Sequence, residues 1–90
     1  MKTVYKYDVN AEVYSVKLEL PAGAKIVHVG NQGYQDVVNV WVELSHTDGV
    51  PEIRTFRVFG TGHEIPSDYE YVGTTIVTPY LAWHLYELVG

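Results

Sequence analysis

The side chains best suited to binding chemistry gather between residues 54 and 66. This stretch holds both arginines of the chain, two glycines separated by one residue, and a histidine, at Arg54, Arg57, Gly60, Gly62 and His63. A guanidinium forms paired hydrogen bonds to a carboxylate or phosphate, and glycines let an anion approach successive backbone N–H groups. The sequence therefore predicts a site for an anionic ligand, with contacts from Arg57, Gly60, Thr61, Gly62 and His63.

The two arginines are not expected to serve one site. They are three residues apart, which places them on opposite faces of an ideal strand unless a bulge or a second subunit intervenes, and we assign the site to Arg57. The alternative for either arginine is a surface ion pair with Glu52, Glu64 or another acid. For the glycines it is a tight connection that needs positive φ, and for His63 it is a loop position that bonds a backbone carbonyl.

Aromatic residues near the C-terminus offer further contacts. Tyr80, Trp83, His84 and Tyr86 combine large apolar surfaces with polar tips, which suits stacking on a purine ring or an interface hot spot. The alternative is that Trp83 and Leu85 belong to the core while the tyrosines cover sheet edges. We add Trp83 to the predicted ligand contacts, as the residue that stacks on a base.

Catalysis and metal binding find little support in the residue patterns. No cysteine is present, and none of the serines, at positions 15, 45 and 67, lies in a nucleophile elbow. The histidines at positions 28, 46, 63 and 84 lack the paired spacing typical of a metal site. The Gly-x-Gly pair lacks the further glycine and the helix of a dinucleotide fingerprint. We expect no catalytic residues, no metal and no cofactor.

Alternation of apolar and polar residues predicts the strands that position these side chains. The candidates are residues 2–9, 14–20, 25–30, 37–45, 53–59 and 71–77, the last with a bulge or bend at Gly73. Loops are expected at 31–36 and 46–51, and a loop or single helical turn at 65–69. Residues 80–89 fit a strand or a helix, and the density of aromatic residues favours a strand.

The expected fold class is therefore all-β, a small sandwich or barrel of mostly antiparallel strands. The alternative is α+β with a C-terminal helix at 80–89. Ninety residues make one domain, 1–90, whose core is small enough that a homo-oligomer is expected. The formal net charge of -5 disfavours an extended nucleic-acid surface. No apolar run approaches the roughly 20 residues that span a bilayer, so we expect no membrane contact and a cytoplasmic location.

Three segments carry a family resemblance. They are Tyr5-Lys6-Tyr7, then Phe59-Gly60-Thr61-Gly62-His63-Glu64-Ile65-Pro66 followed by Tyr71-Val72-Gly73-Thr74, and finally Trp83-His84-Leu85-Tyr86-Glu87. In this order and spacing the chain resembles a family of short uncharacterised proteins encoded by bacteriophages and prophages. The resemblance spans most of the chain and implies a phage context and a compact β-fold. It supplies no catalytic residues.

The predicted function is binding without catalysis. Our first hypothesis is that the protein sequesters a small anionic, nucleotide-like ligand during host takeover or counter-defence, in the cytoplasm of the host bacterial cell. Arg57 and the loop N–H groups would hold phosphate while Trp83 or a tyrosine stacks on the base. The alternatives are an acidic inhibitor that binds a host protein through Trp41 or Tyr34, and a minor virion or structural protein.

Overall fold

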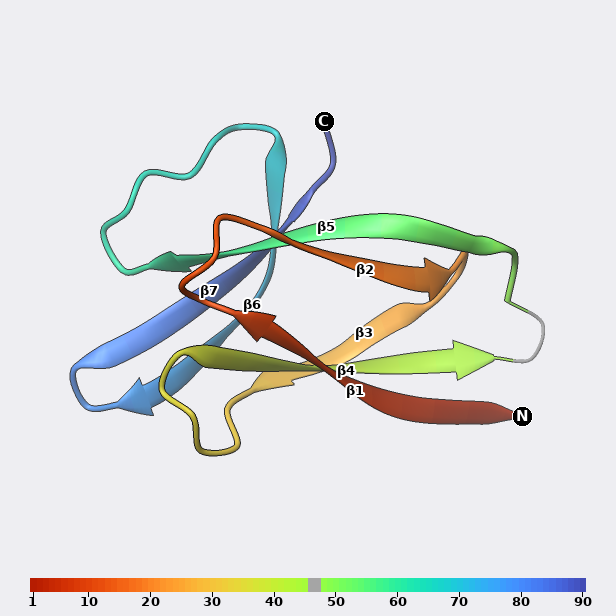
Figure 1. Ribbon diagram of the computed structural model, residues 1–90, viewed down its shortest axis with the longest axis horizontal. Coiled ribbons are helices and arrows are strands. Elements are labelled where there is room, and N and C mark those ends of the chain that lie inside the picture. The colour runs from red at the N-terminus through yellow and green to blue at the C-terminus, as the bar shows by residue number, and fades with distance from the viewer. Residues whose placement is uncertain (46–47) are drawn as a thin grey trace.

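Seven strands form two antiparallel sheets (Figure 1). The computed structural model describes residues 1–45 and 48–90. The strands are β1 (Lys2–Asn10), β2 (Val16–Pro21), β3 (Lys25–Gly30), β4 (Val37–Ser45), β5 (Pro51–Gly60), β6 (Tyr69–Thr78) and β7 (Leu81–Leu88). Sheet A has the order β1-β4-β3, and sheet B has the order β2-β5-β7-β6. His46 and Thr47, in the loop expected at 46–51, lie outside the described residues.

The all-β prediction is confirmed, and the two sheets make a sandwich. Residues 81–88 form a strand, so the alternative of a helix at 80–89 is wrong. The reason is pairing: β7 lies between β5 and β6, and both neighbours bond to its backbone. The single helical turn considered at 65–69 is also absent, because residues 67 and 68 make a simple turn into β6. Across the described residues, no helix is long and apolar enough to cross a membrane.

The core lies between the facing sides of the two sheets. Val38, Val40 and Val42 of β4 alternate inward and are fully buried, and Phe56 of β5 and Leu85 of β7 join them in one cluster. Burying side chains of this size stabilises the fold by about 1.5–3 kcal/mol each. Because Phe56 points inward, alternation along β5 turns the odd-numbered residues of this strand toward the outer face of sheet B.

One polar side chain is buried on the outer face of sheet A. Asn39 is 5% exposed; its Nδ2 donates to Asp8 Oδ1 at 2.7 Å and its Oδ1 accepts from the Gln32 N–H at 2.8 Å. Trp41, two residues along β4, packs against His28 with ring centroids 5.3 Å apart. Trp41 is therefore half-buried rather than a fully exposed surface aromatic.

Gly73 lies at a bulge in β6, as the sequence predicts. The register between β6 and β7 shifts between Tyr71 and Gly73. A Cβ placed on Gly73 would be 2.7 Å from Val29 Cγ2 and 2.9 Å from Val29 Cβ. The absent side chain therefore lets β6 approach β3 of the other sheet, a contact that joins the two layers.

We expect Gly73→Ala to lower the free energy of unfolding by about 2 kcal/mol, since the added methyl overpacks against Val29. Val29→Ala removes the nearest obstructing atom, Cγ2, but keeps the Cβ, so it relieves part of the overlap and carries its own cost. The double variant should still be more stable than the sum of the two single changes predicts. Urea denaturation of the four proteins measures this coupling. Strict additivity would contradict the contact.

Candidate functional site

The order of the strands forces the loop of residues 61–68 across sheet B. β5 and β6 both run antiparallel to β7, which lies between them. Gly60, at the end of β5, pairs with Trp83, whereas Tyr69, at the start of β6, pairs with Leu88. The loop must therefore cover about 17 Å along β7, as a connection between parallel strands does. It contributes lining residues to cavities at both ends of this path.

The first cavity lies where β5 enters this loop and has a volume of about 260 Å³. We call it the end cavity. It is lined by Gly60, Thr61, His63, Tyr80, Leu81, Ala82 and Trp83. Four of the six predicted ligand contacts thus come together here. Gly62 is not in the lining, but it alone of the Gly60–Gly62 pair has positive φ, at 90°, so its role is the turn itself.

Two N–H donors of the end cavity already have acceptors within the protein. The Gly60 N–H donates to His63 Nδ1 at 3.2 Å, and Trp83 Nε1–H donates to the Gln35 carbonyl at 2.6 Å. His63 is thus a loop histidine as the alternative held, although it bonds a backbone N–H rather than a carbonyl. Among the described residues, no lysine or arginine lines this cavity. An anion there would meet no full positive charge.

Arg57 points to the outer face of sheet B, away from the end cavity. Its guanidinium carbon lies 4.0 Å from the centre of the Tyr14 ring and 4.6 Å from that of Phe59. Such cation–π contacts are worth about 0.5–1 kcal/mol at exposed sites. Within residues 1–45 and 48–90, no carboxylate forms an ion pair with Arg57. The stacked rings orient its donors without satisfying its charge.

A second and larger cavity, of about 510 Å³, lies on this same face. We call it the outer-face groove. It is lined by Tyr14, Ser15, Lys17, Thr55, Pro66, Asp68, Tyr69 and Leu88. Lys17 lies opposite Thr55 in the β2–β5 register, so Lys17 and Arg57 are diagonal neighbours on one face. The groove is thus lined by one cation, Lys17, together with aromatic rings and one carboxylate. Arg57 does not line the groove itself but lies beside it, stacked on the lining residue Tyr14.

A family model matches residues 1–90. The chain belongs to the family described as Domain of unknown function (DUF7352). No curated protein and no solved structure matches the chain. The DUF7352 description carries no activity, so the chemistry of the site has to be argued from its own residues.

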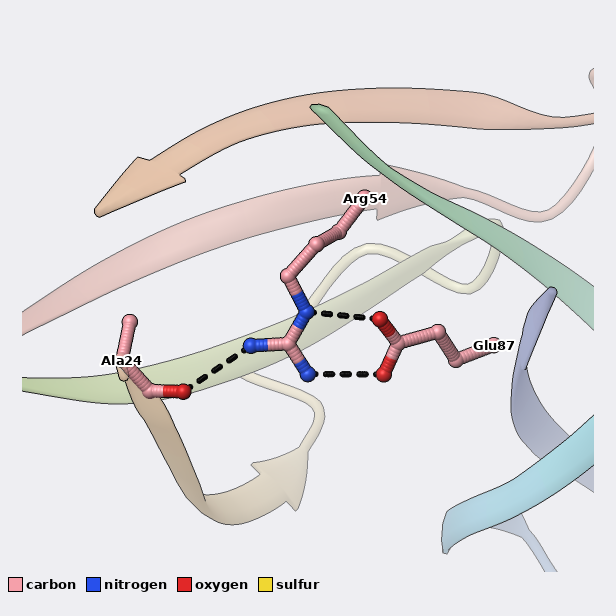
Figure 2. Close-up of polar contacts among 3 residues, drawn as sticks. All are labelled: Ala24, Arg54 and Glu87. Carbon is pink, nitrogen blue, oxygen red and sulfur yellow. Dashed lines mark hydrogen bonds and ion pairs between the residues drawn. The ribbon is translucent and has the colours of Figure 1, made fainter. Parts of the chain in front are cut away.

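Arg54 forms an ion pair with an acid, Glu87 (Figure 2). This is the alternative that the sequence offered for either arginine. Its Nε and Nη2 donate to the two Glu87 carboxylate oxygens at 2.6 and 2.7 Å, and its Nη1 donates to the Ala24 carbonyl at 2.9 Å. The bond to Glu87 raises the pKa of Arg54, outweighing burial, which lowers it. Its contribution to stability is therefore present below the ordinary pKa of arginine and lost only in strong alkali.

Aromatic packing anchors the rest of the outer face. Phe59 is 3% exposed, and its ring makes edge contacts with Tyr69 at 5.7 Å and Tyr86 at 5.5 Å between centroids. His84, on the same face of β7, has Nε2 2.8 Å from Thr61 Oγ1. These contacts attach both ends of the 61–68 loop to the sheet and so hold the wall of the groove.

In the described part of the chain, no metal site can be assembled, since nowhere do three His, Asp or Glu side chains converge. His63 and His84 bond within the loop region, and His28 packs on Trp41. His46, the remaining histidine, lies outside the described residues.

Sequence reasoning missed Tyr14 and Lys17 as candidate contacts. Alternation along the strand predicted at 14–20 places Tyr14 on the same face as Val16 and Lys17 on the opposite face. β2 begins only at Val16, so Tyr14 precedes the strand and its ring lies on Arg57 instead. Lys17 was expected on the other face, but its proximity to Arg57 follows from the β2–β5 register, which alternation alone does not specify. The sequence did predict that Arg57 and Arg54 lie on opposite faces of the strand.

Removing one partner of the Arg54–Glu87 pair should be costly, because both side chains are about four-fifths buried, at 20% and 18% exposure. We expect Arg54→Met or Glu87→Gln to lower the free energy of unfolding by about 3 kcal/mol, since each leaves the other charged group without its partner. The double change Arg54→Met/Glu87→Met should recover most of this loss. Chemical denaturation followed by Trp fluorescence measures all three.

The matched control is the other arginine of the same strand. Arg57→Met removes cation–π stacking alone and should cost about 1 kcal/mol or less. Equal losses for the two arginines would contradict the assignment of Arg54 to structure.

Proposed function

We propose that the protein binds a small anionic, nucleotide-like ligand in the outer-face groove and performs no catalysis. The observation that carries this proposal is the state of Arg57. Its guanidinium is oriented by Tyr14 and Phe59, yet no carboxylate among the described residues pairs with it, although the chain has a net charge of -5. An oriented arginine without an acid partner is suited to a phosphate or carboxylate from outside.

The groove has the size and chemistry that such a ligand needs. Its volume of about 510 Å³ lies within the roughly 300–1,000 Å³ of small-molecule sites. Lys17 and Arg57 would share a phosphate, while Tyr14, 72% exposed with one ring face on Arg57, offers its other face to a base. Asp68 in the far wall would accept hydrogen bonds from ligand hydroxyl or amino groups.

The contact set predicted from sequence is thereby divided. Gly60, Thr61, His63 and Trp83 line the end cavity, where the charge needed for an anion is missing. In this proposal they act indirectly, since they shape the start of the loop whose later residues, Pro66 and Asp68, line the groove. Arg57 remains the central contact, and Lys17 and Tyr14 take the places given to the glycine loop and Trp83.

The biological setting we propose rests on the resemblance to phage and prophage proteins. Sequestering a nucleotide signal of the host requires binding alone, which suits a small chain without a catalytic constellation. The site of action would be the cytoplasm of the host bacterial cell, in host takeover or counter-defence.

A second candidate is the acidic inhibitor of a host protein. Tyr34, in the β3–β4 loop, is 77% exposed, and an exposed tyrosine on an acidic surface is a typical interface anchor. Charge reversals far from the groove should then abolish binding, and a pull-down from host lysate without a stoichiometric partner would argue against it. A virion role instead requires the protein in purified particles.

Isothermal titration with a panel of nucleotides and cyclic nucleotides tests the main proposal. We expect measurable binding of at least one of them, weakened about 10- to 100-fold in Arg57→Ala, because a hydrogen-bonded charge is worth about 1.5–3 kcal/mol. Lys17→Ala should weaken the same ligand.

Two variants serve as controls. Lys25→Ala removes an exposed lysine from sheet A, and Tyr80→Ala removes a 97% exposed side chain from the end cavity; both should bind as the wild type does. No heat with any nucleotide, or a loss in Tyr80→Ala equal to that in Arg57→Ala, would overturn the assignment to the groove.

A further inference from the structure

Four described strands lie at the edges of the two sheets, and they differ in how open they are. β3 has a bulge between Ile26 and His28, β6 has two register shifts, and β2 is six residues long and ends at Pro21. Bulges, prolines and short length all block pairing with another strand. β1 has none of these: it pairs with β4 over nine residues in one continuous register. It therefore presents an unbroken open edge, seen at the lower right of Figure 1.

Lysines on an edge strand often prevent it from pairing with another strand. The lysine side chains of β1, however, extend over sheet A toward β4, away from the open edge. Lys2 Nζ lies 3.4 Å from Glu43 Oε1, and Lys6 Nζ donates to Gln32 Oε1 at 2.7 Å. Both partners belong to β4 or to the loop before it, so the ammonium groups lie toward β4. Between the lysines, Val4 and Tyr5 are 50% and 54% exposed, one on each face of the strand.

We propose that β1 pairs with β1 of a second copy of this chain, antiparallel and with Tyr5 on the two-fold axis. The two three-stranded sheets then become one sheet of six strands. In this register Lys2, whose side chain is 68% exposed, lies opposite Asp8 of the partner subunit. Its ammonium group would exchange the contact with Glu43 for that carboxylate, while Asp8 Oδ1 keeps the bond from Asn39, and the symmetry forms the pair twice. Tyr5 lies opposite Tyr5 of the partner subunit, and opposed aromatic and charged pairs both stabilise antiparallel strands.

Charge and burial select this register over its neighbours. A two-fold axis at Val4 would set Lys2 opposite Lys6, and an axis at Lys6 would set that lysine opposite itself, both unfavourable. An axis at Tyr7 would pair Lys6 with Asp8 but would extend the interface to Val9, which is fully buried in the core cluster. The register centred on Tyr5 avoids both problems.

This dimer is independent of the proposed function. Its interface is the edge of sheet A, whereas the outer-face groove lies on sheet B. An experiment that refutes one of the two proposals therefore does not refute the other.

Single-cysteine variants test the register directly, because the chain has no cysteine of its own. Opposed residues of an antiparallel pair have Cα atoms about 4.5–5.5 Å apart, within the range of a disulfide. We expect Tyr5→Cys to form a disulfide-linked dimer under mild oxidation. In the matched variant Thr3→Cys the two thiols would be offset by four residues, about 14 Å, and should remain unlinked.

Sedimentation equilibrium of the wild-type protein should show a dimer, weakened at least about tenfold by Lys2→Glu, which turns two attractive pairs into two repulsive ones. Lys25→Glu, with the same change of net charge, should leave the dimer intact. A monomeric wild type, equal cross-linking of Thr3→Cys and Tyr5→Cys, or equal effects of the two charge reversals would overturn the proposal.

Discussion

The ion pair between Arg54 and Glu87 is the interaction on which the rest of this structure depends. It places a cation on the core-facing side of sheet B, where burial is costly unless the charge is fully paired, and both oxygens of Glu87 and the carbonyl of Ala24 complete its bonds. Glu87 is on β7 and Ala24 directly precedes β3, so one guanidinium joins neighbouring strands and both layers of the sandwich. With Arg54 held inward, alternation along β5 turns Arg57 outward. Strand geometry therefore separates the two arginines: Arg54 is held within the protein, and Arg57 is left on the outer face, where we propose that it binds the ligand.

The same geometry separates the glycine stretch, at the end cavity, from Arg57 on the outer face of sheet B. Gly60 pairs with Trp83 at one end of β7, and the chain must travel to the other end before β6 begins. Gly62 supplies the turn, and His63 and Thr61 fasten it to Gly60 and His84. Residues whose types suit ligand contact thus form the start of the loop that crosses the sheet. The groove that results is walled by Pro66 and Asp68 on one side and by β2 on the other.

Local periodicity was enough to predict most of the fold, because each buried face imposes a two-residue repeat on its strand. The alternation of Val38, Val40 and Val42 predicted β4, and Gly73 predicted the bulge in β6. The segment at 81–88 stayed ambiguous because its apolar spacing fits both periods, and pairing on both sides decided it. For the site, the three-residue spacing predicted that the two arginines lie on opposite faces, and the burial of Phe56 shows that Arg57 is the one that faces outward. The residues beside Arg57 could not be predicted. Lys17 lies near it because of the β2–β5 register, and Tyr14 contacts it because β2 begins two residues later than alternation suggests.

The central claim is that Arg57 binds an external anion while Arg54 is held within the protein. The chain has two arginines, so two side-chain Nε–H signals are expected in a ¹H–¹⁵N NMR spectrum, and titration with the tightest-binding nucleotide distinguishes them. The account predicts that the Arg57 signal shifts together with backbone amides of Lys17, Thr55 and Asp68, while the Arg54 signal stays in place. Shifts confined to Gly60–His63 and Trp83, with Arg57 unmoved, would contradict it.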